Sequence, residues 1–141
     1  CVVEVKSHSK NKEKIRINNI DQLNYKFYQN LFLASYALEN NISGENLNDL
    51  IKNIHNKIGD NQSARNAFDD KLNAYGYYEM HSDKYNQSMK IDNLAIFKLG
   101  DNFPAILKSE LRKGVSDVAF SINISECNDF KTVFDELKKL F

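Results

Sequence analysis

The chain has 141 residues, of which 42% are hydrophobic and 27% charged, and its formal net charge at pH 7 is zero. This composition is typical of a soluble globular domain, and the zero net charge excludes an overall basic field, so any DNA contact must come from a local patch. No apolar run approaches the roughly 20 residues of a membrane span. Neither Cys1 nor Cys127 has metal-ligand spacing, and we therefore expect a cytoplasmic protein without membrane contact.

Residues 1–7 alternate in the manner of a β-strand, so that Glu4 and Lys6 share one face about 7 Å apart. This pair suits phosphodiester hydrolysis, because a carboxylate can hold a divalent cation while an ammonium group orients water and stabilises phosphate charge. The backbone carbonyl of Val5 is a further candidate ligand for Mg²⁺. The alternative is that Glu4 and Lys6 only form the polar face of a half-buried strand.

Residues 1–18 as a whole predict a β-hairpin, because Ile15 and Ile17 alternate with charged residues after a polar turn. The segment is the most cationic of the chain. One interpretation is that its side chains contact the phosphate backbone of DNA; the other is a solvated edge strand protected by charge. The candidate contacts are Lys10, Lys12, Lys14 and Arg16.

Residues 20–39 predict a long helix, since apolar residues from Ile20 to Leu38 recur with a period near 3.6. Gln22 lies three residues after Asn19, which fits a helix cap. The functional alternative is that Gln22 faces Glu4 and Lys6 as a catalytic residue. We also assign Tyr25 and Lys26 as candidate nucleic-acid contacts on this segment.

The rest of the chain predicts helices at 46–58 and 63–75, strands at 91–99 and 118–124, and a final helix with Phe130, Phe134 and Phe141 on its apolar face. The strand at 91–99 is expected to be buried on both faces. A second Glu-x-Lys, at Glu136 and Lys138, falls in the final helical pattern, where residues two apart do not share a face. The fold class is therefore α/β, with a mixed sheet flanked by helices.

The stretch VVEVKS resembles the E-x-K half of the PD-(D/E)XK nuclease signature. Together with INNIDQL, LFLASYALE and the late run from IFKLGDNFPAIL to SINISEC, the chain is similar to a bacterial family of PD-(D/E)XK motif proteins. The resemblance implies part of a restriction-endonuclease-like fold and a Mg²⁺-dependent DNA endonuclease with partners in a restriction or phage-defence system. It implies Glu4 as metal ligand, Lys6 as the water-orienting cation and Gln22 as a supporting contact. NFP and SINISEC are expected to belong to scaffold or partner surface.

One departure from the family pattern is serious, because only three residues precede Glu4 and the Asp of the "PD" half cannot lie before it. We expect residues 1–141 to be a single domain and the C-terminal portion of a longer protein. Residues 1–40 would end the nuclease core with the E-x-K strand and its following helix, and 41–141 would be specific to the family. With one carboxylate, this chain alone is expected neither to bind Mg²⁺ well nor to cleave.

Two other functions remain open from the sequence. The chain can be a nuclease-fold module that binds DNA or a partner subunit without cutting, in which case the hairpin cations matter more than Glu4. It can also be a scaffold whose helices at 46–75 dock another protein.

Overall fold

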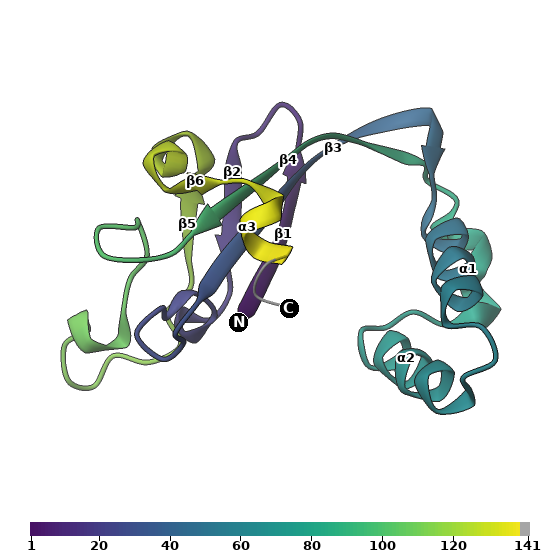
Figure 1. Ribbon diagram of the computed structural model, residues 1–141, viewed down its shortest axis with the longest axis horizontal. Coiled ribbons are helices and arrows are strands. Elements are labelled where there is room, and N and C mark those ends of the chain that lie inside the picture. The colour runs from purple at the N-terminus through teal and green to yellow at the C-terminus, as the bar shows by residue number, and fades with distance from the viewer. Residues whose placement is uncertain (139–141) are drawn as a thin grey trace. The chain divides into compact units, whose positions relative to one another are not determined.

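The computed structural model describes residues 1–138. The chain forms two compact units, one made of Cys1–Glu39 with Ile91–Phe141 and the other of Asn40–Lys90. The first unit holds most of the strand residues, and the second holds the two longest helices (Figure 1).

A mixed four-stranded sheet runs in the order β1-β3-β4-β6. β1 is parallel to β3, and β6 is antiparallel to β4. The predicted α/β class with a mixed sheet is thus confirmed. The four strands are β1 (Val2–Ser9), β3 (Leu31–Glu45), β4 (Met89–Lys98) and β6 (Lys131–Thr132).

A separate two-stranded sheet pairs β2 (Lys14–Ile17) with β5 (Phe120–Asn123) in antiparallel fashion. The predicted hairpin over 1–18 is therefore wrong in its pairing, although both of its strands exist. Ile15 and Ile17 lie opposite Ile122 and Phe120. This apolar match across the two strands places β2 beside β5, a partner that local alternation does not identify.

The predicted helix over 20–39 is also wrong. Ile20–Leu23 form a single 3₁₀ turn, η1, and the chain then enters β3, which begins within the predicted helix and runs on to Glu45. A strand in the middle of a sheet is covered on both faces and so carries a continuous apolar run, and such a run also satisfies a helical period. Leu31, Phe32 and Leu33 are all at most 1% exposed, as this position requires.

The two faces of β3 pack into different clusters. Leu31 and Leu33 join the main core together with β2, β4 and β5, whereas Phe32 packs with Ile96 and Val3. Glu4 is in register with Leu33. Since register partners in a sheet point to the same side, Glu4 and Lys6 project to the side of the main core.

The second unit consists mainly of α1 (Leu47–Ile58), α2 (Gln62–Ala74) and the 3₁₀ segment η2 (Glu79–Tyr85). The helices predicted at 46–58 and 63–75 are thus confirmed. Asn46 and Asp49 form a reciprocal capping box at the start of α1. Gly59 has a φ of 62° at its end, a conformation that glycine adopts readily.

The late part of the chain is more irregular than predicted. β4 is buried only at Ala95–Phe97, so the expectation of burial on both faces holds for its second half alone. The predicted strand at 118–124 shortens to β5, and η3 (Lys108–Glu110) and η4 (Ile124–Phe130) are 3₁₀ segments. The final helix is α3 (Phe134–Lys138), so Phe130 precedes it, and Phe141 lies outside the described residues. Among residues 1–138, no helix is long and apolar enough to cross a membrane.

Candidate functional site

Glu4 and Lys6 stand side by side on β1, with Lys6 Nζ 2.8 Å from Glu4 Oε1. Their side chains are only 23% and 15% exposed. The intervening Val5 points to the other face and is 58% exposed. The polar pair is therefore better shielded from water than the apolar residue between them, which strengthens the attraction between the two charges.

Gln22 completes this cluster from η1. Its Oε1 accepts a hydrogen bond from Lys6 Nζ and another from the backbone N–H of Asn18, both at 3.2 Å. Asn19 holds η1 in place, because its side chain accepts from the N–H of Asp21. The structure thus brings Glu4, Lys6 and Gln22 together, although Gln22 stands on a single 3₁₀ turn instead of a long helix.

Ser35 is a neighbour of this cluster that the sequence interpretation missed. It lies in register with Lys6 on the adjacent β3, and it is only 2% exposed. Its Oγ has no hydrogen-bond partner among the described residues. A buried hydroxyl without a partner is costly and therefore uncommon, so Ser35 is a further candidate for the site. Assigning 20–39 to a helix hid it, since only the strand register brings it beside Lys6.

The oxygen ligands at this place are few. Mg²⁺ takes roughly six oxygen ligands, usually including one or two carboxylates. Glu4 offers one carboxylate, which already faces the Lys6 ammonium, and no group of three or more His, Cys, Asp or Glu residues suited to a metal occurs within 1–138. Glu4 and the Val5 carbonyl therefore do not complete a magnesium site by themselves.

Lys10, a candidate DNA contact, is engaged in ion pairs. Its Nζ lies 2.7 Å from Asp92 Oδ1 and 3.0 Å from Glu39 Oε2. Hydrogen bonds to these carboxylates, that to Asp92 above all, raise the pKa of Lys10 above its usual 10.5. Its charge is thus largely balanced within the protein.

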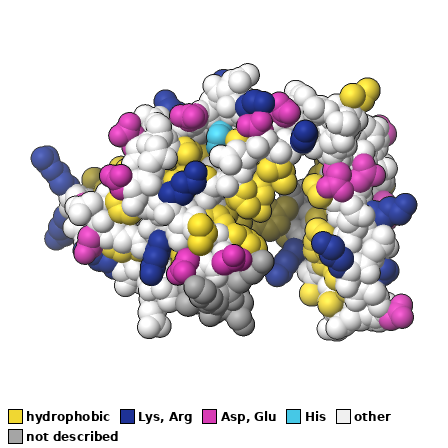
Figure 2. Space-filling view, turned by 45° about the horizontal axis from the view of Figure 1, so that its top comes forward, with side chains coloured by type: hydrophobic (Ala, Val, Ile, Leu, Met, Phe, Trp, Pro, Cys, Tyr) yellow, Lys and Arg dark blue, Asp and Glu magenta, His cyan; other side chains and the backbone are white. Residues whose placement is uncertain are grey.

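Tyr25 packs against the main core, and its hydroxyl lies 3.5 Å from Asp101 Oδ1. Burial, and then the Asp101 charge, raise the pKa of Tyr25. The remaining candidate contacts are exposed and have no ion-pair partner among the described residues; they are Lys12, Lys14, Arg16 and Lys26. On the face drawn in Figure 2, Lys and Arg side chains lie among Asp and Glu side chains, in keeping with the zero net charge.

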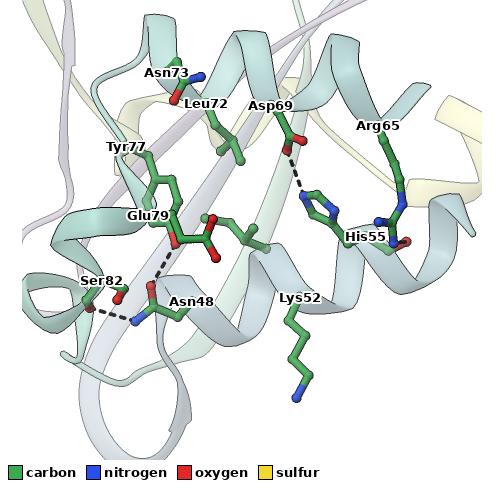
Figure 3. Close-up of a pocket in the computed structure, with 11 residues that line it drawn as sticks. Asn48, Lys52, His55, Arg65, Asp69, Leu72, Asn73, Tyr77, Glu79 and Ser82 are labelled. Carbon is green, nitrogen blue, oxygen red and sulfur yellow. Dashed lines mark hydrogen bonds and ion pairs between the residues drawn. The ribbon is translucent and has the colours of Figure 1, made fainter. Parts of the chain in front are cut away.

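The second unit contains a pocket of about 700 Å³ between α1, α2 and η2 (Figure 3). His55 Nε2 lies 2.9 Å from Asp69 Oδ1, which joins α1 to α2. Tyr77 donates its hydroxyl to Asn48 Oδ1 at 3.0 Å, and Arg65 donates to the carbonyl of Gly59. Much of the polar lining is thus used to hold the helices together.

Comparison with known proteins gives one family. A model of the family described as "Putative PD-(D/E)XK family member, (DUF4420)" matches residues 1–125, a range that includes Glu4, Lys6, Gln22 and Ser35. No curated protein and no solved structure matches the chain. Because the match covers most of the 141 residues, the chain belongs to this PD-(D/E)XK family.

Proposed function

We propose that this chain supplies the Glu-x-Lys half of a Mg²⁺-dependent DNA endonuclease that acts in a bacterial restriction or phage-defence system. Family membership and the Glu4–Lys6 pair support the proposal. The observation that carries it is the contact of Lys6 with both Glu4 and Gln22, because these contacts fix an ammonium group whose side chain is largely shielded from water. A fixed cation is what stabilisation of a developing phosphate charge requires.

Each residue of the cluster has its own role in this proposal. Glu4 and the Val5 carbonyl would hold Mg²⁺, which when bound neutralises phosphate charge and lowers the pKa of water. The other oxygen ligands, a second carboxylate included, would come from the DNA and from the preceding portion of a longer protein. Lys6 would orient the attacking water, and Gln22 keeps Lys6 in place through its 3.2 Å hydrogen bond.

The test is cleavage of supercoiled plasmid DNA in Mg²⁺ by the longer protein and by residues 1–141 alone. We expect cleavage by the longer protein, a loss of at least about a hundredfold in Glu4→Gln and Lys6→Ala, and no cleavage by the shorter chain. Glu136→Gln, from the second Glu-x-Lys, is the matched control and should retain activity. A longer protein that does not cleave in any divalent metal would overturn the proposal.

A module that binds DNA without cutting is the second candidate. The exposed cations on and beside β2, which have no ion-pair partner within the described part of the chain, favour it, since they need no metal to act. Under this alternative, Glu4→Gln would not weaken the DNA complex. Cleavage that depends on Lys6 rules it out.

A further inference from the structure

The β2–β5 sheet has two chemically different faces. Ile15, Ile17 and Ile122 are at most 3% exposed and belong to the main core. On the opposite face, Lys14 lies across from Asn123 and Arg16 across from Ser121, and all four residues are exposed. This outer face therefore carries two cations and two neutral hydrogen-bonding side chains, with no carboxylate among them.

A notch of about 380 Å³ adjoins this face at the end where β2 begins and β5 finishes. It is lined by Lys12 and Lys14 from one side and by Asn123 and Ser125 from the other, together with Glu13. The backbone N–H of Ile124 donates to the carbonyl of Glu13 at 2.8 Å, which fixes the two walls relative to each other. Two ammonium groups, an amide and a hydroxyl are the groups that commonly contact phosphate oxygens.

The cations of β2 and of the notch differ from Lys6 and Lys10 in their ion pairing. Lys6 and Lys10 are paired with carboxylates 2.7 to 3.0 Å away. Lys12, Lys14 and Arg16 have no ion-pair partner in the part of the chain that the structure describes. Their positive charge is thus available to an external anion.

The outer face also leads to the candidate site. β2 ends at Ile17, and the next N–H, that of Asn18, donates to the same Gln22 Oε1 that accepts from Lys6. Arg16 is two residues from this contact, and Lys14 follows about 7 Å further along the strand. The strand that carries Lys14 and Arg16 therefore leads directly into the backbone that contacts Gln22.

We propose that this basic ribbon, defined as Lys14, Arg16, Ser121 and Asn123 with Lys12 and Ser125 at its end, is the surface that holds duplex DNA against the site. The inference rests on the proposed function and adds to it β5, most of which lies in the SINISEC stretch that we expected to belong to scaffold or partner surface. A two-stranded ribbon is among the elements that fit a DNA groove. The cations contact phosphates, while Ser121, Asn123 and Ser125 donate hydrogen bonds to phosphate or base edges.

The test is fluorescence anisotropy with a labelled DNA duplex over a series of salt concentrations, using residues 1–141. Combined Lys12→Ala, Lys14→Ala and Arg16→Ala should weaken binding at least tenfold and lower the salt slope by about 2 to 3, because each substituted cation leaves one phosphate with its counterions. Arg112→Ala, Lys113→Ala and Lys131→Ala together remove the same charges at other exposed positions and should change both quantities far less. Equal effects of the two triple variants would overturn the proposal.

Uncharged variants test the contribution of β5. Ser121→Ala with Asn123→Ala should weaken binding several-fold with an unchanged salt slope, and no weakening would overturn the role of β5.

Glu13→Gln removes the carboxylate that lines the notch and should tighten binding, a gain that misfolding cannot produce. The two proposals are tested separately by DNA binding. The ribbon variants should lose binding, whereas Glu4→Gln, which should not cleave, should still bind DNA. Tighter binding to single-stranded DNA than to duplex also counts against the ribbon proposal.

Discussion

Lys10 and Asp92 join two strands that are not neighbours in the sheet. Lys10 follows β1, Asp92 lies on β4, and β3 runs between these strands, yet the Nζ–Oδ1 distance is 2.7 Å. Glu39, on β3, accepts from the same ammonium group. The ammonium group thus links the three strands at this end of the sheet through side chains.

This link predicts a loss of stability at high pH. Since Asp92 and Glu39 raise the pKa of Lys10 above 10.5, the folded chain binds this proton more tightly than the unfolded chain. The stabilisation is complete below pH 10.5 and disappears as the pH rises through the higher folded value. Urea unfolding should show Lys10→Met less stable than the unmodified protein at about pH 9, with a smaller difference at about pH 11. A difference that does not vary with pH contradicts this account.

The contacts of Lys6 predict that substitutions of Lys6 and Gln22 have coupled effects on the free energy of unfolding. Lys6→Met leaves the half-buried Glu4 carboxylate without its cation and should lower the free energy of unfolding by about 1–2 kcal/mol. Gln22→Ala removes the acceptor for Lys6 and should cost about 1 kcal/mol. The double variant should be less destabilised than the sum, with a coupling of at least about 0.5 kcal/mol. Lys12→Met, at an exposed position, is the control, and additive effects of Lys6 and Gln22 would contradict the contact.

Cys127 should be inert while the protein is folded. It is fully buried, and burial, with a smaller contribution from Glu126, raises its pKa to about 11. Since the thiolate is the reactive form, a thiol reagent at about pH 8 should label only the exposed Cys1 in the native protein and both cysteines in urea. Cys1→Ser should therefore abolish native labelling. Rapid native labelling of Cys127 would show that its surroundings open.

The sequence predicted local features better than partners. Ile15 and Ile17 identify β2 by alternation, but their pairing with β5 depends on a match to Ile122 far along the chain. The apolar run from Leu31 fits both a helix and a central strand, and burial between β1 and β4 decides for the strand. The proximity of Glu4 and Lys6 could be predicted because residues two apart on one strand share a face. Ser35 was not, because its place beside Lys6 exists only through the register of β1 and β3.

Gly44 should not tolerate a side chain. A Cβ there would overlap the backbone carbonyl of Met89, and both residues lie in the second unit. Gly44→Ala must therefore push the two backbone segments apart, and we expect a loss of about 1–3 kcal/mol in the free energy of unfolding. Gly100→Ala is the matched control, since nothing among the described residues lies within 4 Å of its Cβ position. Equal stability of the two variants would contradict the close approach.

The Ser35 hydroxyl should contribute nothing to stability and should support the proposed reaction. Its buried Oγ has no partner within residues 1–138, so Ser35→Ala removes an unsatisfied hydroxyl, and we expect the free energy of unfolding to stay constant or rise by up to about 1 kcal/mol. Leu33→Ala, two residues away on the same face, should instead cost about 3 kcal/mol. If the hydroxyl serves the reaction beside Lys6, Ser35→Ala should also lower cleavage by the longer protein about tenfold. Destabilisation by Ser35→Ala would show that the hydroxyl has a structural partner in solution, and unchanged cleavage would remove Ser35 from the site.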